Sequence, residues 1–224
     1  RNLQKLPNQT PTLADLDEML PMLPTTTNNI IYGYVGNPFI ITLNIPKAQL
    51  ITIYKIVGTF GIYKSSNNGL SWTQLNSGWS NTITAIAISG DTILAGARSG
   101  GVEMSIDGGV TWHTINTGLP SQINALTIIG STFLAGTIYG IYVSTDGGNS
   151  WAISSVSYPI NALMCVGNDV FAACDNNGGV YQSSNGGISW ITINSGLTNL
   201  TVYSLCVNGS YLFAGTTGYV FSSI

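Results

Sequence analysis

The chain has 224 residues and a formal net charge of −3, and only 7% of its residues are charged, against about a quarter in an average soluble domain. Its six Lys and Arg residues form no basic cluster, which argues against a nucleic-acid partner. No apolar run approaches the roughly 18 residues of a membrane-spanning helix. The surface must therefore be rich in Ser, Thr, Asn and Gly, a composition more typical of extracellular or structural proteins than of cytosolic enzymes.

Residues 1–49 differ in pattern from the rest of the chain, and we expect them to form a separate N-terminal module. Thr12 followed by Asp15 is typical of a helix start, and leucines at helical spacing follow until Pro21 and Pro24. Runs of strand-forming residues occupy 30–35 and 39–45. A capping helix is the favoured interpretation over a partner-binding helix. The order helix, strand, Gly-Asn-Pro, strand also resembles one leucine-rich-repeat unit of bacterial surface proteins.

An eight-residue motif occurs four times in the second part of the chain, residues 50–224. Residues 50–59, at the start of this part, match a degenerate first repeat. The motif begins at Ser65, Ser105, Ser144 and Ser183, so that the steps are 40, 39 and 39 residues, and a fifth copy is expected to begin at Ser222. Each copy ends in Trp. A period this regular is the sequence pattern of a repeat architecture.

Each repeat contains four short strand candidates, which we call A to D in chain order. In the third repeat they are 123–129, 132–137, 140–144 and 150–154, with Gly or Asn at the junctions. Four short antiparallel strands every 39 residues is the length of one propeller blade. The sequence therefore predicts an all-β protein built from four-stranded antiparallel units.

The motif, with the preceding Gly-x-Tyr-x-Ser and the Phe/Leu-Ala-Gly-Thr strand, resembles the Asp-box or BNR repeat of sialidase-like propellers over residues 58–224. The resemblance implies a β-propeller, complete or partial, of about five blades, with each box forming the turn between strands C and D. Propellers of this kind include sialidases, xyloglucan hydrolases, sorting receptors and photosystem assembly factors. The resemblance is therefore specific for the fold and uninformative about the activity.

The box residues suit a structural turn. The Asp side chain can accept bonds from turn amides, the Gly permits positive φ, and the Trp is expected to pack between neighbouring blades. Asn67 and Asn185 replace the Asp in two copies, which keeps the acceptor and loses the charge. We therefore expect no metal or cofactor at these structural positions: Ser65, Asn67, Gly69, Trp72, Ser105, Asp107, Gly109, Trp112, Ser144, Asp146, Gly148, Trp151, Ser183, Asn185, Gly187 and Trp190.

Nothing in the sequence supports catalysis. The resemblance to sialidases would require three arginines on the substrate carboxylate, whereas the chain has only Arg1 and Arg98. Glycoside hydrolysis needs two facing carboxylates, but Asp107 and Asp146 lie in boxes, and Asp91 and Asp169 are expected in A–B turns. His113 is expected to be a surface residue. We predict a non-enzyme, and the alternative is a sialidase-like glycoside hydrolase with an incomplete or shared site.

The B–C and D–A loops should gather on the face opposite the boxes, and they differ between repeats. Variable loops on a rigid scaffold commonly carry binding, although ordinary loop variation would look the same. Trp79 aligns with Leu119 and Leu197, which favours packing over a carbohydrate platform. The candidate ligand-binding residues are Arg98, Tyr139, Tyr158, Asp175 and Asn176.

The chain has three cysteines. This odd number does not suit a set of paired disulfides, and no two of the cysteines have the spacing of a metal site. Cys165 and Cys206 align with apolar or small residues of the other repeats, so we expect them in the core as free thiols. The sequence as a whole predicts a secreted or cell-surface scaffold that binds protein or glycan through its B–C and D–A loops. It predicts no nucleic-acid partner and no membrane span, and it leaves a homo-oligomer or a larger assembly open.

Overall fold

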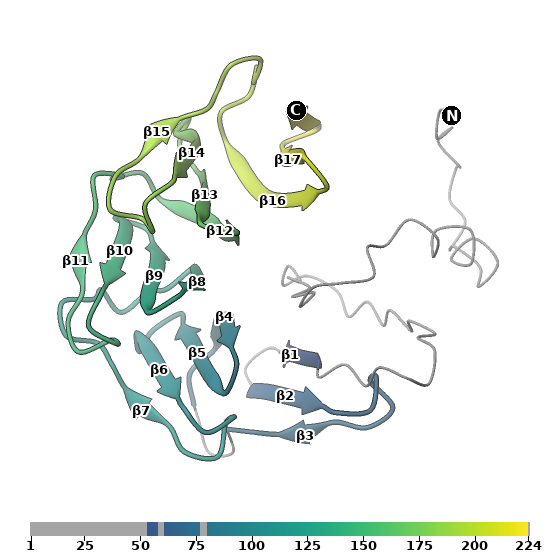
Figure 1. The fold of residues 1–224 in the computed structure, drawn as a ribbon, viewed down its shortest axis with the longest axis vertical. Helices are drawn as coiled ribbons and strands as arrows, with labels where there is room; N and C mark the ends of the chain where they lie inside the picture. The colour runs from purple at the N-terminus through teal and green to yellow at the C-terminus, as the bar shows by residue number, and fades with distance from the viewer. Residues whose placement is uncertain (1–52, 58–60, 77–79, 224) are drawn as a thin grey trace. The chain divides into compact units, whose positions relative to one another are not determined.

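The computed structural model describes residues 53–57, 61–76 and 80–223. The predicted N-terminal module (1–49) and Trp79 lie outside this part of the chain. All the described secondary structure is β-strand, and the strands form five antiparallel sheets in which neighbours in the sequence are neighbours in the sheet (Figure 1). We call these sheets blades 1 to 5.

Blades 2, 3 and 4 each have four strands in the predicted order A to D. The D strands contain only two residues each, which is shorter than the predicted 150–154. Blade 2 contains β4 (Ile83–Ser89), β5 (Thr92–Ala97), β6 (Val102–Ser105) and β7 (His113–Thr114). Blade 3 contains β8 (Ala125–Ile129), β9 (Thr132–Thr137), β10 (Gly140–Ser144) and β11 (Ala152–Ile153). Blade 4 contains β12 (Ile160–Val166), β13 (Asp169–Cys174), β14 (Gly179–Ser183) and β15 (Ile191–Thr192).

Blades 1 and 5 each have three described strands. Blade 1 consists of β1 (Ile53–Val57), β2 (Gly61–Ser65) and β3 (Thr73–Gln74), which correspond to strands B, C and D. Blade 5 consists of β16 (Val202–Asn208), β17 (Tyr211–Thr216) and β18 (Val220–Ser223), which correspond to strands A, B and C.

The register of blade 5 corrects the predicted start of the fifth box. The box serines of the other blades pair with the second residue of strand B, as Ser105 does with Ile93 and Ser144 with Phe133. In blade 5 the residue in this position is Ser223, which pairs with Leu212. Ser222 was therefore the wrong choice. Asp169 also differs from its prediction, because it is the first residue of β13, whereas Asp91 lies in the A–B turn.

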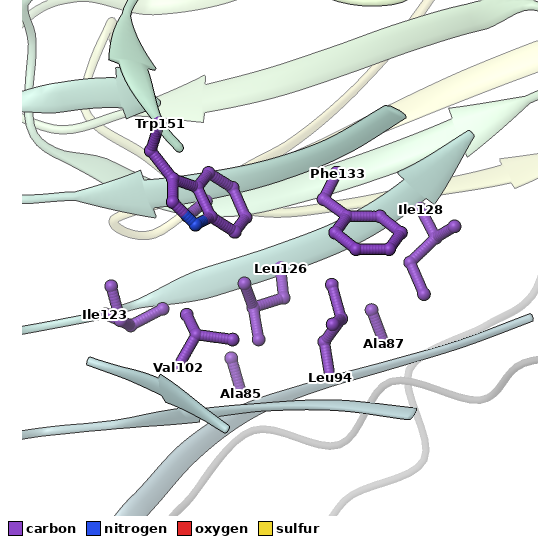
Figure 2. Close-up of a cluster of buried hydrophobic side chains, with 10 residues drawn as sticks. Ala85, Ala87, Leu94, Val102, Ile123, Leu126, Ile128, Phe133 and Trp151 are labelled. Atoms are coloured by element: carbon purple, nitrogen blue, oxygen red, sulfur yellow. The ribbon is translucent and has the colours of Figure 1, made fainter. Parts of the chain in front are cut away.

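Apolar side chains between consecutive blades form the core. The first strands of blades 2 to 5 lie next to one another in chain order, as strands nearest the axis of a propeller do. Figure 2 shows the junction of blades 2 and 3, where Trp151 and Phe133 lie over Leu126 and face Leu94 and Val102 of blade 2. The Phe133 and Trp151 ring centroids are 6.4 Å apart.

Three of the four box tryptophans lie at these junctions, as predicted, but they are buried to different degrees. Trp151 is only 6% exposed, and its indole nitrogen donates to the carbonyl of Ile115 in blade 2 at 2.8 Å. Trp112 packs on the cluster between blades 1 and 2 and Trp190 on the cluster between blades 3 and 4. Both are half-buried, and each indole donates within its own box, to Gly109 and Gly187 respectively.

The cysteines are all free, and only Cys174 lies in the buried core, whereas Cys165 is partly buried. Cys174 is buried, and burial raises the pKa of its thiol to about 12. Cys206 is exposed, which contradicts its predicted place in the core. Its counterparts Ala87 and Thr127 are 2% and 1% exposed because the next blade covers them, whereas the described residues provide no such cover for blade 5.

Candidate ligand-binding surface

Hydrogen bonds between turns define the two ends of the blades. In blade 2 the box and the A–B turn meet, because the amide of Gly108 donates to the carbonyl of Asp91 at 2.9 Å. At the other end the B–C loop of blade 2 meets the D–A loop that leads into blade 3, where the amide of Gly100 donates to the carbonyl of Ser121 at 3.0 Å. We call these the box end and the loop end.

Each box is closed by its own side chains. In blade 2 the buried hydroxyl of Ser105 donates to Asp107 at 2.7 Å and accepts from the amide of Gly109 at 2.8 Å. The Asp107 carboxylate also accepts from the amide and the hydroxyl of Thr111, at 2.9 and 2.6 Å. The box serine therefore holds both ends of the turn, a role that sequence reasoning did not assign to it.

The boxes with Asn have the same geometry as those with Asp. Asn185 accepts from the hydroxyl of Ser183 and from the amide of Ser189, both at 2.9 Å, and its own amide donates to the Ser189 hydroxyl at 2.8 Å. The charge is therefore not needed to form the turn, as the two substitutions predicted.

Hydrogen bonding lowers the pKa of both box aspartates. For Asp146 the hydroxyl of Ser150 is the largest cause, followed by the amide of Ser150 and the hydroxyl of Ser144, and together they bring the pKa to about 2. The hydroxyl of Thr111 is the largest cause of the depressed pKa of Asp107. Both carboxylates are therefore charged at neutral pH, and their oxygens accept hydrogen bonds within their own turns. They are for this reason poor candidates for a catalytic acid or base.

An asparagine after strand D binds the start of strand C in three blades, and this position was missed by the sequence reasoning. Asn116 accepts from the amide of Val102 at 2.6 Å, and Asn194 accepts from the amide of Val180 at 2.7 Å. A Cβ atom at Gly101 would lie 2.1 Å from Asn116, so only glycine allows this approach. The repeated Asn-x-Gly at residues 76, 116 and 194 was the available signal.

At the loop end, the segments that carry Tyr139 and Tyr158 meet at the junction of blades 3 and 4. The amide of Ile141 donates to the carbonyl of Val156 at 3.2 Å, and a Cβ atom at Gly140 would lie 3.1 Å from the Cα of Ser157. The two segments therefore run side by side, with Tyr139 in the turn just before Gly140 and Tyr158 next to Ser157. Both side chains are open to solvent, at 57% and 39% exposed.

The ring of Tyr158 packs against residues of blade 4. A Cβ atom at Gly178 would lie 2.7 Å from Cγ of Tyr158, so the ring packs directly on this glycine. The ring centroid of Tyr181 is 6.3 Å away at a tilt of 36°. Burial, with smaller contributions from Cys174 and Tyr158, raises the pKa of Tyr181. Tyr158 is thus a supported ring with an open side, rather than a mobile loop residue.

Asp175 and Asn176 lie beside Tyr158 in a tight turn. The amide of Asp175 donates to the carbonyl of Pro159 at 2.8 Å, and the amide of Gly178 donates back to the Asp175 carbonyl at 2.9 Å. Asn176 and Asn177 have φ values of 50° and 63°, the positive pair that a type I′ turn requires and that Asn tolerates. The side chain of Asp175 accepts from the amide of Asn176 at 2.8 Å.

Four of the five predicted binding residues therefore meet at one junction, and the fifth does not. Arg98 lies in the B–C loop of blade 2, where its amide donates to the carbonyl of Thr82 at 2.9 Å. Gly178 and Tyr181, from one hairpin, and Pro159 surround Tyr158, and they were missed because none of them breaks the repeat. We call Tyr139, Tyr158 and the turn 175–178 the tyrosine surface.

Catalytic groups do not converge on the tyrosine surface. Of the acidic residues that the structure describes, Asp175 alone lies at the loop end. Glu103 lies on β6 and accepts from the Thr114 hydroxyl at 2.7 Å. His113 is exposed on β7. No group of three or more potential metal ligands occurs within the described residues. A shallow hollow lies elsewhere, between blades 4 and 5, beside Val180, Leu197 and Phe221.

No protein-family profile and no curated protein matches the sequence, but 456 chains of solved structure match the fold. A GH74 xyloglucanase from Xanthomonas campestris has a TM-score of 0.58 at 18% identity over 75% of this chain and 32% of its own. YCF48 bound to D1 peptide has a TM-score of 0.56 at 14% identity over 77% of this chain and 66% of its own.

The extracellular domain of a putative one-component system from B. thetaiotaomicron has a TM-score of 0.57 at 18% identity, over 77% of this chain and 25% of its own. A designed protein, Ika4, is matched over 93% of its length and 66% of this chain, with a TM-score of 0.53 at 18% identity. The chain thus spans only a quarter to a third of the GH74 enzyme and the extracellular domain. Identities this low support a similarity of fold and nothing more. Among the described residues, no helix is long and apolar enough to cross a membrane. The chain has the β-propeller fold.

Proposed function

We propose that the protein is a non-catalytic, secreted or cell-surface scaffold of the Asp-box type that binds a partner, protein or glycan, through its loop end. The observation that carries the proposal is the tyrosine surface, where two exposed rings and a rigid Asp-Asn-Asn-Gly turn meet at one blade junction. Tyrosine provides a large contact area at a small entropic cost, and Asn, Ser and Gly supply adaptable hydrogen bonds, as in antibody binding sites.

The charges at the loop end support a non-catalytic role. A glycoside hydrolase requires an acid and a second carboxylate about 5–10 Å apart, whereas Asp175 is the single described carboxylate there, and one of its oxygens is bound to the turn. The extracellular assignment is supported by the low charge content and by the extracellular propeller among the structural neighbours.

The proposal is tested by binding and turnover measurements on the same sample. A combined glycan and protein array should give signals that the double variant Tyr139→Ala/Tyr158→Ala loses, while circular dichroism shows that the variant remains folded. Fluorogenic glycosides should not be hydrolysed. Turnover that disappears in Asp175→Asn would show that the protein is an enzyme and would refute the proposal.

A further inference from the structure

The chain has an extreme charge distribution: its Lys and Arg residues are at positions 1, 5, 47, 55, 64 and 98, and there is none from residue 99 to the C-terminal Ile224. Blades 3, 4 and 5 therefore contain no lysine or arginine, while Asp146, Asp169 and Asp175 lie within them. A ligand that carries carboxylates, sulfates or phosphates would meet no cationic partner in these blades. The tyrosine surface is therefore poorly suited to an anionic ligand.

The side chains at the tyrosine surface suit hydroxyl groups and the weakly polar faces of sugar rings. Tyr139 and Tyr158 offer exposed aromatic rings, and Tyr158 is fixed by Gly178 beneath it. Asn176 projects from a turn whose backbone is locked, and its side-chain amide has no hydrogen-bond partner among the described residues. The amide can both donate and accept, which is what a row of sugar hydroxyls requires.

A peptide ligand is less well matched by the same contacts. Extended peptides commonly add to a free strand edge, but here the edge beside Tyr139 is already occupied, since Ile141 donates to Val156. Protein hot spots are enriched in Trp, Tyr and Arg, and of these types the tyrosine surface offers only Tyr among the described residues. The surface is open rather than a deep pocket, which favours an extended polymer over a small molecule.

Building on the proposed function, we propose that the tyrosine surface binds a neutral polysaccharide whose sugar rings lie across Tyr139 and Tyr158. Its hydroxyls hydrogen-bond with Asn176 and the Asp175 carboxylate.

Affinity electrophoresis of the intact chain tests the inference. Native gels would contain xyloglucan, glucomannan, hydroxyethylcellulose or soluble starch, with polygalacturonate as the anionic comparison. At least one neutral polysaccharide should retard the wild type. Tyr158→Ala should weaken this retardation about tenfold or more, the loss of one good contact of about 1.4 kcal/mol. Tyr158→Phe should stay within about threefold, because the ring rather than the hydroxyl makes the contact.

Matched variants separate recognition from folding. Tyr211→Ala, which removes a 46% exposed ring beside the A–B turn of blade 5 at the box end, should bind as the wild type does. Asn176→Gly keeps the positive φ and should weaken binding. If Tyr158→Ala does not fold, Tyr139→Ala serves instead, because this ring is more exposed.

The inference is overturned if no neutral polysaccharide retards the wild type, if Tyr158→Ala and Tyr139→Ala bind like the wild type, or if polygalacturonate retards it most. If a polypeptide binds the wild type and Tyr158→Ala abolishes that binding, while no polysaccharide retards the wild type, the inference is overturned. The proposed scaffold function then still stands. Cleavage of the polysaccharide overturns the scaffold function itself.

Discussion

The unequal burial of the box tryptophans predicts unequal stability losses. A Trp side chain buries on the order of 200 Å², which at about 25 cal/mol per Å² corresponds to roughly 5 kcal/mol. Trp151 is 6% exposed and also bonds the neighbouring blade through Ile115. Trp151→Ala should therefore cost about 3–5 kcal/mol, the usual range for buried aromatic truncation.

Trp112 provides the matched comparison. It is half-buried and its indole is bound within its own box, so Trp112→Ala should cost roughly half as much, about 2 kcal/mol. Urea unfolding followed by circular dichroism measures both losses, and Trp151→Phe should recover part of the larger one. Equal losses in the two Ala variants, or a loss below about 1 kcal/mol for Trp151→Ala, would refute the assignment of Trp151 as the inter-blade wedge.

Three further predictions concern single positions. The hydroxyl of Thr127 is buried without a partner, so Thr127→Val should stabilise the protein by about 1 kcal/mol in urea unfolding; a loss would point to an unrecognised bond. Gly101 has a φ of 76° and touches Asn116, so Gly101→Ala should cost at least about 1–2 kcal/mol, and an unchanged unfolding midpoint would contradict the tight approach. The pKa values of Asp107 and Asp146 are lowered by folding, so their stabilisation is complete above about pH 5 and is lost as the pH falls towards about 2. The melting temperature of the double variant with Asn at both positions should therefore fall less over that range than that of the wild type, and parallel curves would argue against the box bonds.

The repeat made most of the fold predictable. Strands β9 and β10 match their predicted bounds because glycines such as Gly130, Gly140 and Gly147 mark the turns around them. The D strands were predicted too long because only two residues of each pair with strand C. The fifth box begins one residue later than predicted because the step from Ser183 to Ser223 is 40 residues, as between Ser65 and Ser105, whereas the prediction repeated the two intervening steps of 39.

The binding surface was predictable only in outline. The fold places B–C and D–A loops together, so Tyr139, Tyr158 and Asp175 could be nominated from loop variation alone. Their convergence could not be foreseen, because it depends on the contact of Gly140 with Ser157 and of Tyr158 with Gly178. These are irregular loop contacts with no periodic pattern. The exposure of Cys206 was missed for a related reason, since alignment with Ala87 assumes that every blade is covered by a following one.

The central claim is that the boxes serve folding and the loop end serves binding. It is tested most directly by measuring array binding for two variants with matched melting temperatures: Tyr139→Ala/Tyr158→Ala at the loop end and Asp107→Asn/Asp146→Asn at the box end. The tyrosine variant should lose the wild-type signals, and the box variant should keep them at neutral pH. Loss of binding in the box variant, with the tyrosine variant unaffected, would contradict the claim.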